Sequence, residues 1–178
     1  MAFIFKPCPI QGLFEIYPEV YSDGRGYFLE TWSQRDFEAA GIAGKYVQDN
    51  QSCSSKGVLR GLHFQKLFPQ GKLVRAIEGE VFDVAVDLRP GSSTRGKWHG
   101  VFLSGKKQNQ FYIPEGFAHG FLVLSDTAIF AYKCTDFYRP EDESGLLWDD
   151  PAVGIKWPDI GMAYILSDKD KKLPGFID

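Results

Sequence analysis

The sequence predicts an all-β protein: an antiparallel sandwich or barrel, most commonly closed as a jelly roll, with one or few short helices. Short β-type runs recur about every eight to twelve residues, turn signals such as Pro90-Gly91 separate them, and helical periodicity is nearly absent between them. The composition agrees, because 15 Phe, 8 Tyr and 4 Trp accompany 19 Gly and 10 Pro, which favours strands joined by tight turns.

One short helix is expected early in the chain. Ser33 can cap its start, and Asp36 takes its third position. Phe37 and Ala40 share one face, and Gly41 can close the helix in a left-handed conformation. The expected strands are Tyr27–Thr31, Val58–Gln65, Leu73–Ile77, Val81–Leu88, Val101–Leu103, Gln110–Ile113, Gly120–Leu124 and Ala128–Thr135.

The strand Val81–Leu88 alternates most clearly. One face carries Phe82, Val84, Val86 and Leu88, and the other carries Val81, Asp83, Ala85 and Asp87. This strand therefore places carboxylates on a face that we expect to look into a cavity.

Residues 1–178 are expected to form a single domain, because no linker, repeat or low-complexity tract divides them. The stretch from Glu141 to Asp178 differs, since tryptophans and prolines punctuate it and its periodicity is weak. We expect the chain from about residue 141 to wrap over the domain.

Charge and hydropathy exclude several function classes. The chain has 20 Lys+Arg against 23 Asp+Glu, a net charge of −3, so no basic excess predicts a nucleic-acid or anionic-membrane partner. No apolar stretch approaches the roughly 20 residues of a membrane span, and Met1–Ile10 lacks the apolar block of a secretory signal. Cys8, Cys53 and Cys134 are far apart and form no C-x-x-C pair, which fits reduced thiols in a cytoplasmic protein.

Three histidines, His63, His99 and His119, are available for chemistry. A lone strand histidine is more often structural than catalytic, but two of them near Arg60 and Lys72 make a functional site competitive. Strict alternation places Arg60 and His63 on opposite faces of their strand, so a shared site requires a bulge or bend at Gly61.

Metal and nucleotide motifs are incomplete or absent. The segment Pro114–His119 matches the second motif of metal-binding cupin jelly rolls, P-x-G-x-x-H, but His63 is followed by Phe64 and Gln65 where the first motif needs another histidine. No phosphate-binding glycine loop occurs. A phosphate-bearing ligand would have to be held by cations, and the candidates are Arg25, Arg60, Lys72 and Lys169. Taken singly, each such residue is more often ordinary surface charge.

Long ordered segments carry a resemblance that spans nearly the whole chain. They are Asp23–Glu30, Val47–Asn50, Val58–Gln65, Gln70–Arg75, Gly79–Asp87, Ile113–Phe121, Tyr132–Thr135, Trp148–Pro151 and Leu166–Asp170. Together they resemble the dTDP-4-dehydrorhamnose 3,5-epimerase family, metal-free cupin-fold enzymes of dTDP-L-rhamnose synthesis. The resemblance implies an isomerase that uses no cofactor and converts dTDP-4-dehydro-6-deoxy-D-glucose into dTDP-4-dehydro-L-rhamnose.

The resemblance also implies roles for particular residues. His63 would be the base, oriented by Asp170, and Tyr132 would be the acid that reprotonates the sugar from the opposite face. Lys72, with help from His119, would stabilise the enolate oxygen. The positions at which the family grips substrate are Arg25, Glu30, Gln48, Asn50, Arg60, Glu143 and Lys169, with Tyr138 stacked on the thymine ring. In the family the early strand that carries Arg25 and Glu30 crosses to a neighbouring subunit, which implies a homodimer.

The chemistry makes these roles sensible. A 4-keto group acidifies the hydrogens on C3 and C5, so a neutral imidazole can serve as base near pH 7 when a carboxylate stabilises its charged form. Inversion needs a proton donor on the other side of the ring, and a tyrosine suits this if Lys72 lowers its pKa. We therefore expect His63 and Tyr132 to face each other across the ligand.

Three alternatives remain open from the sequence. A relative acting on one carbon, a 3-epimerase, would share these catalytic residues. A non-catalytic jelly-roll sugar-binding module would use the cavity for binding alone. A metal-dependent cupin oxygenase would need a divalent ion at the histidines.

Overall fold

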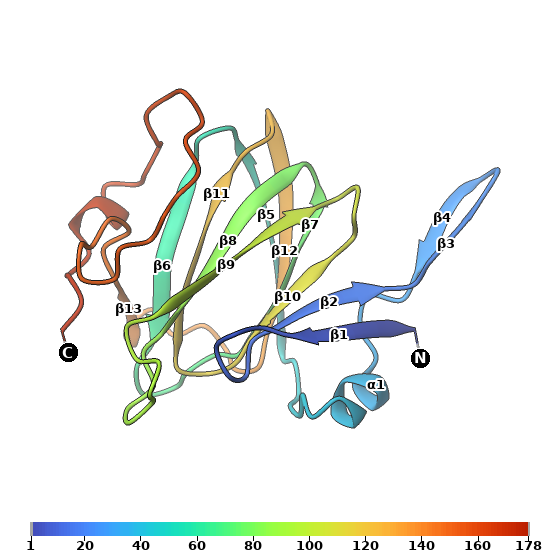
Figure 1. The fold of residues 1–178 in the computed structure, drawn as a ribbon, viewed down its shortest axis with the longest axis horizontal. Coiled ribbons are helices and arrows are strands. Elements are labelled where there is room, and N and C mark those ends of the chain that lie inside the picture. Colours follow the sequence, from blue (N-terminus) through green and yellow to red (C-terminus); the bar gives the residue numbers. More distant parts are fainter. Residues whose placement is uncertain (1, 178) are drawn as a thin grey trace.

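The computed structural model describes residues 2–177, and two antiparallel sheets face each other across its core (Figure 1). The six-stranded sheet has the order β1 (Phe3–Pro7), β2 (Phe14–Pro18), β10 (Gln110–Ile113), β7 (Lys72–Glu78), β12 (Thr127–Cys134) and β5 (Gln48–Ser55). The five-stranded sheet has the order β13 (Glu143–Gly145), β6 (Leu59–Gln65), β11 (Phe117–Val123), β8 (Glu80–Asp87) and β9 (Trp98–Ser104). From β5 to β12 the chain passes repeatedly between the two sheets, which is the jelly-roll pattern. The predicted fold class is confirmed.

Three small elements lie outside these sheets. Strands β3 (Val20–Asp23) and β4 (Gly26–Leu29) form a hairpin that projects from the body (Figure 1). Helix α1 (Gln34–Ala39) follows it, and a 3-10 turn, η1 (Asp170–Lys172), lies near the C-terminus. Ser33 occupies the N-cap of α1 and Gly41 has a φ of 82°, as predicted, but the Ser33 side chain makes no capping hydrogen bond. Its carbonyl instead accepts the Phe37 N–H at 3.0 Å.

Every strand that the sequence predicts is present, Gln110–Ile113 with the predicted ends and the others with shifted ends, but five further strands within residues 2–177, β1, β2, β3, β5 and β13, were not predicted. Strand β5 is an edge strand of sequence QDNQSCSS, so it lacks the apolar alternation that identifies a strand. Strands β1 and β2 both end at a proline, a residue that weakens a strand pattern and is tolerated at strand ends and sheet edges.

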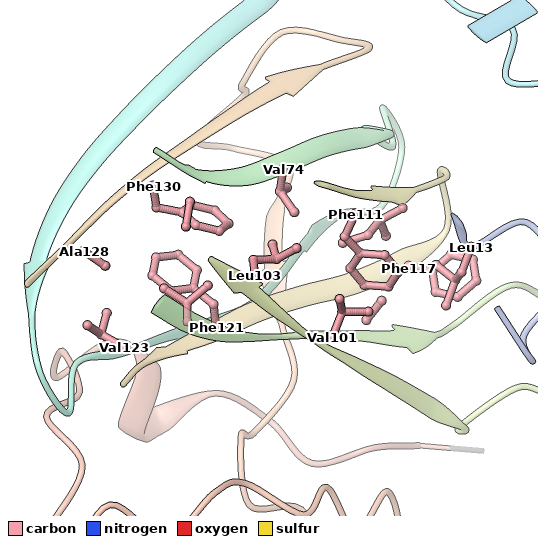
Figure 2. Close-up of a cluster of buried hydrophobic side chains, with 14 of the residues drawn as sticks. Leu13, Val74, Val101, Leu103, Phe111, Phe117, Phe121, Val123, Ala128 and Phe130 are labelled. Carbon is pink, nitrogen blue, oxygen red and sulfur yellow. The ribbon is translucent and has the colours of Figure 1, made fainter. Parts of the chain in front are cut away.

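An aromatic and aliphatic core fills much of the space between the sheets (Figure 2). Phe111 is fully buried on β10. The rings of Phe121 on β11 and Phe130 on β12 stack with centroids 4.1 Å apart, which joins the two sheets. The half-buried Tyr132 packs against the edge of this core, so the apolar filling stops at that residue.

Strand β8 has the two faces that the sequence predicts. Val81 and Ala85 belong to the core between the sheets, whereas Phe82, Val84 and Val86 belong to a second cluster on the other face. Asp83 shares the inner face and is fully buried.

The chain beyond Glu141 supplies most of the cover for that second cluster. Leu146, Val153 and Trp157 pack against the outer face of the five-stranded sheet, and Leu59 N–H donates to the carbonyl of Ile165 at 3.0 Å. This segment thereby places η1 beside β6. Neither helix in residues 2–177 has the length and hydropathy needed to cross a membrane.

Candidate active site

Two neighbouring cavities open between the sheets beside the apolar core, with volumes of about 480 Å³ and 300 Å³. His63, Lys72 and Tyr132 line both of them. His63 lies on β6 of the five-stranded sheet, whereas Lys72 and Tyr132 lie on β7 and β12 of the six-stranded sheet. The three side chains therefore reach one space from opposite walls, with no packed apolar layer between them.

The cavities gather most of the residues that the sequence singles out. The larger one is lined among others by Arg60, His119, Lys169 and Asp170, and the smaller one by Gln48, Asn50, Tyr138 and Glu143. Arg25 and Glu30 line neither cavity. They lie on or next to the projecting hairpin, where Arg25 pairs with Asp23 at 2.5 Å and is 92% exposed.

The expected bend in β6 occurs at Gly61. Its φ is 111°, a value that favours glycine, and the pairing of β6 with β11 shifts register between His63 opposite His119 and Arg60 opposite Phe121. A Cβ on Gly61 would lie 2.6 Å from the Gly120 Cα. The two backbones thus touch at this point, and the bulge lets Arg60 and His63 line the same cavity.

His63 and Asp170 form a side-chain pair across the fold. His63 Nε2 lies 2.7 Å from Asp170 Oδ1, and the Gly61 N–H donates to the same carboxylate. Burial alone would raise the pKa of Asp170, but the hydrogen bond and charge of His63, together with hydrogen bonds from Gly61 and Ser167, outweigh burial, and the pKa is lowered. An ionised Asp170 accepts the Nε2 proton, which leaves Nδ1 of the neutral ring as the basic nitrogen.

Lys72 is a buried cation. Its side chain has an exposed fraction of 9%, and burial lowers the pKa of its ammonium. No salt bridge among residues 2–177 includes it. An anion that forms in the cavity would therefore gain a desolvated, uncommitted positive charge.

Tyr132 remains protonated in this environment. Burial raises the pKa of its phenol, and the cation that opposes the rise is Arg60. The expectation that Lys72 lowers this pKa is therefore wrong: the pKa is raised, and the positive charge that opposes the rise belongs to Arg60 across the cavity. A protonated phenol is the form that can donate a proton.

His119 pairs with a carboxylate that lies behind it. Its Nε2 is 2.9 Å from Asp83 Oδ2, and both residues are buried. Burial lowers the pKa of His119 and raises that of Asp83, so burial favours the neutral form of each partner. Since Nε2 is taken up by the bond to Asp83, the help to Lys72 that the resemblance implies would have to come from the other ring nitrogen, Nδ1.

Glu143 of the smaller cavity connects Tyr138 to Lys169 of the larger cavity. Glu143 accepts hydrogen bonds from the Tyr138 hydroxyl at 2.6 Å and from the Lys169 ammonium. The bond to Glu143 raises the pKa of Tyr138 to about 12. Lys169 is exposed, so an incoming anionic ligand can draw it away from Glu143.

The site also holds residues that the sequence analysis did not select. Asp83 could be inferred only as a carboxylate on an inward face, without its partner. Cys134 and Gln65 line the smaller cavity; both fall within segments that carry the family resemblance, but no role was expected for either. His99, by contrast, lies outside both cavities, beside Phe111 with ring centroids 6.1 Å apart.

The arrangement does not fit a bound metal ion. Within residues 2–177, no group of three His, Cys, Asp or Glu side chains is placed to hold one. Nε2 of His63 and Nε2 of His119 each face an aspartate instead.

Comparisons with known proteins agree with this geometry. The sequence profile of the family described as dTDP-4-dehydrorhamnose 3,5-epimerase matches residues 7–178. The enzyme of that name from Methanothermobacter thermautotrophicus is 55% identical over 170 residues, 95% of this chain and 92% of its own. A crystal structure of the Elizabethkingia anophelis enzyme superposes with a TM-score of 0.94 at 47% identity, covering 99% of this chain and 97% of its own.

A Legionella pneumophila structure, described as a dTDP-6-deoxy-D-glucose-3,5-epimerase in complex with dTDP-4-keto-L-rhamnose, is similarly close. Its TM-score is 0.93 at 48% identity, with 99% of this chain and 100% of that chain covered. The similarity therefore extends over the whole fold and both walls of the cavities.

Proposed function

This chain belongs to the dTDP-4-dehydrorhamnose 3,5-epimerase family, and we propose that His63 and Tyr132 perform the proton transfers of its reaction from opposite sides of the sugar. The chain is an isomerase that epimerises dTDP-4-dehydro-6-deoxy-D-glucose at C3 and C5 to give dTDP-4-dehydro-L-rhamnose. The observation that carries the proposal is that His63 and Tyr132 reach the same two cavities from facing sheets.

His63 acts as the base through Nδ1. The ketone at C4 acidifies the hydrogen on each flanking carbon, since either carbanion delocalises onto the carbonyl oxygen. Nδ1 takes that hydrogen, and the ionised Asp170, 2.7 Å from Nε2, stabilises the imidazolium that forms. The base and its orienting carboxylate are thereby supplied by β6 and the turn η1.

Tyr132 and Lys72 complete the step from the other wall. The Lys72 ammonium stabilises the enolate oxygen, a contribution of roughly 3 kcal/mol on the scale of one oxyanion-hole donor. Tyr132, whose raised pKa keeps it protonated, returns a proton to the carbon from the opposite face. Deprotonation on one face and reprotonation on the other inverts the centre, and these steps need no cofactor.

The nucleotide holds the uncharged sugar in register. We assign the diphosphate to Arg60 and Lys169, two of the cations that line the larger cavity, and the thymine ring to the exposed Tyr138 beside Gln48 and Asn50. Binding energy from this remote part of the substrate then supports the chemistry at C3 and C5.

The projecting hairpin supports a homodimer with shared sites. Tyr27 and Phe28 are 59% and 71% exposed on β4, so the hairpin presents an apolar surface to solvent, although the Tyr27 hydroxyl accepts a hydrogen bond from Gln108 Nε2 at 3.1 Å. We propose that each chain is one domain whose hairpin crosses to a second copy and adds Arg25 and Glu30 to that copy's site. The three cysteines are free, which suits a reducing compartment such as the cytoplasm.

The reaction is tested by incubating the protein with dTDP-4-dehydro-6-deoxy-D-glucose in deuterated water and following each ring carbon by NMR. Deuterium at both C3 and C5, with the L-sugar as product, is the expected result. Deuterium at C3 alone would instead identify a 3-epimerase, and no exchange at either carbon would favour a binding module.

The shared site is tested by mixing two inactive variants, His63→Ala and the double variant Arg25→Ala/Glu30→Ala. A mixed dimer has one barrel with His63 that receives an intact hairpin, so random pairing should restore about a quarter of wild-type activity. Activity that stays absent after the chains are exchanged would show that the hairpin does not complete a neighbour's site.

A further inference from the structure

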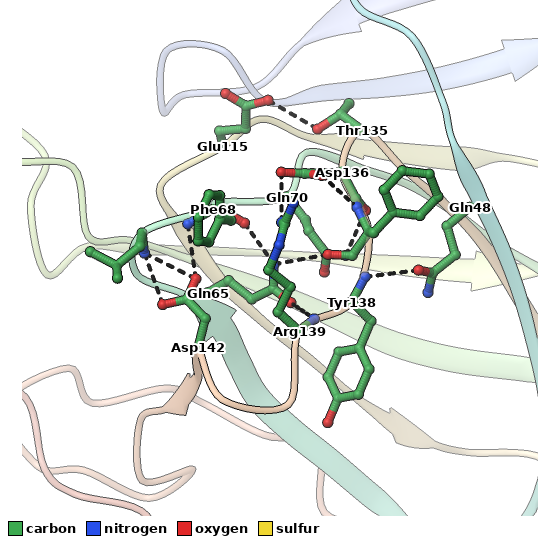
Figure 3. Close-up of polar contacts among 12 residues, drawn as sticks. Gln48, Gln65, Phe68, Gln70, Glu115, Thr135, Asp136, Tyr138, Arg139 and Asp142 are labelled. Atoms are coloured by element: carbon green, nitrogen blue, oxygen red, sulfur yellow. Dashed lines mark hydrogen bonds and ion pairs between the residues drawn. The ribbon is translucent and has the colours of Figure 1, made fainter.

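Gln65, at the end of β6, carries a buried side-chain amide that has no role in the proposed proton transfers. Its exposed fraction is 5%. Its Nε2 donates to the carbonyls of Phe68 at 2.6 Å and Phe137 at 3.2 Å, and its Oε1 accepts the Arg139 N–H at 2.7 Å (Figure 3). Gln65 therefore bonds the backbone on both sides of Tyr138.

A second side-chain amide, that of Gln48, holds the backbone of Tyr138 itself. The Tyr138 N–H donates to Oε1 of Gln48 at 2.8 Å (Figure 3). Three consecutive residues, 137–139, are thus fixed by side chains from β6 and β5. The Tyr138 ring is 48% exposed, so its direction is set by this backbone and by the hydroxyl bond to Glu143, rather than by packing around the ring.

Further contacts join this segment to the loop that follows β6. The Asp142 carboxylate accepts the N–H groups of Leu67 at 3.0 Å and Phe68 at 2.8 Å. The Arg139 guanidinium lies 3.9 Å from the centre of the Phe68 ring. Residues 66–69 and 136–142 consequently form one framework, and Gln65 is the buried amide where its two parts meet.

The position of Gln65 in β6 links this framework to the reaction. Gln65 follows His63 by two residues and, like it, lines the smaller cavity. Residues two apart on a strand share a face and are separated by roughly 7 Å. One strand thus sets the spacing between the base and the framework that holds Tyr138.

We propose that Gln65 is a positioning residue that aims Tyr138 at the nucleobase, and so determines affinity and selectivity for the nucleotide rather than the rate of proton transfer. This inference rests on the proposed function, which places the thymine on Tyr138. Aromatic stacking depends on ring orientation and offset, so a loosened backbone at residues 137–139 weakens it.

The test is the variant Gln65→Met, which keeps the side-chain length and removes all three hydrogen bonds. The affinity for dTDP, measured by calorimetry, should fall about tenfold, the scale of one stacked base, and KM should rise equally while kcat stays within about twofold. If this variant does not fold, Gln65→Glu removes both donors, keeps the acceptor for Arg139 N–H, and is expected to change affinity in the same direction.

Thr135→Val is the matched control. Thr135 Oγ1 accepts the Gly71 N–H at 2.8 Å and donates to Glu115 at 2.9 Å, so it links chain that lies just outside residues 66–69 and 136–142, on the side away from Tyr138 (Figure 3). Its dTDP affinity should stay within about twofold of wild type, since a neutral hydrogen bond contributes modestly to local stability. A loss equal to that of Gln65→Met would overturn the proposal, because any loosening would then suffice.

A double-mutant cycle shows whether Gln65 acts through Tyr138. In a Tyr138→Ala background, Gln65→Met should cause no further loss of dTDP affinity. The proposal is overturned if the loss is the same in both backgrounds, or if Tyr138→Ala itself leaves dTDP affinity unchanged. Failure of the epimerase reaction would appear only in turnover, which this affinity cycle does not use.

Discussion

The same strands build both halves of the space between the sheets, but one half is a packed core and the other is the candidate active site. On β12 the inner face carries Phe130 and then Tyr132, and on β7 it carries Val74 after Lys72. One half is filled by aromatic rings, and the other is left open as the two cavities. A shift of two residues along a strand therefore separates core from site.

The two halves differ in the interactions that fix their side chains. The apolar half is held by packing, as in the stacked rings of Phe121 and Phe130. The open half is held by polar pairs in the cavity wall, His63 with Asp170 and His119 with Asp83. Variants in the first half should change stability, and variants in the second should change chemistry.

The largest effect is expected for His63→Asn, which removes the base but keeps a donor near Asp170. Turnover should fall by about 10²–10⁴-fold, the usual contribution of a general base, while the melting temperature changes little. The measurement is kcat by NMR together with thermal unfolding. Turnover near the wild-type value would remove His63 from the mechanism.

Phe111→Ala should lower stability and leave turnover unchanged, the opposite of His63→Asn. Phe111 is fully buried in the core and lines neither cavity, so its truncation should cost about 3–5 kcal/mol of unfolding free energy. Below the melting temperature kcat should be retained. Ile177→Ala, at an 80% exposed position, is the control and should change stability by less than about 0.5 kcal/mol.

Lys72→Met should change turnover and folding stability in opposite directions. Turnover should fall about 10²–10³-fold through loss of the oxyanion partner, while stability rises by about 1 kcal/mol because a desolvated charge is removed. Folding lowers the pKa of Lys72, so the unfolded chain binds more protons between the folded value and 10.5. The extra stability of Lys72→Met over wild type is therefore complete below the folded-state pKa of Lys72 and disappears as the pH rises toward 10.5. Denaturant unfolding at several pH values measures it, and a destabilised variant at neutral pH would contradict the account.

The fold and most of the site could be predicted from sequence because alternation and turn signals are local. Val81–Leu88 shows this, since both of its predicted faces are found. Strand β5 could not be predicted, because its polar residues face a cavity and carry no apolar alternation. The need for a bend at Gly61 could be inferred, but its form depends on contact with Gly120, which lies far along the chain.

Electrostatic detail was the least predictable part. The cation that opposes the rise in the Tyr132 pKa is Arg60, and identifying it requires knowing which side chains meet across the cavity. Gln65 gave no signal for a similar reason, since its partners are backbone groups near residues 68 and 138. Such interactions depend on tertiary proximity and not on local pattern.

The most direct test of the account is Tyr132→Phe in deuterated water, since it removes the acid and keeps the base. We predict that the recovered substrate gains deuterium, because His63 still removes and returns a proton on one face, while inverted product falls by about 10²–10⁴-fold. Inverted product at the wild-type rate would show that the second proton does not come from the wall opposite His63, and would contradict the account.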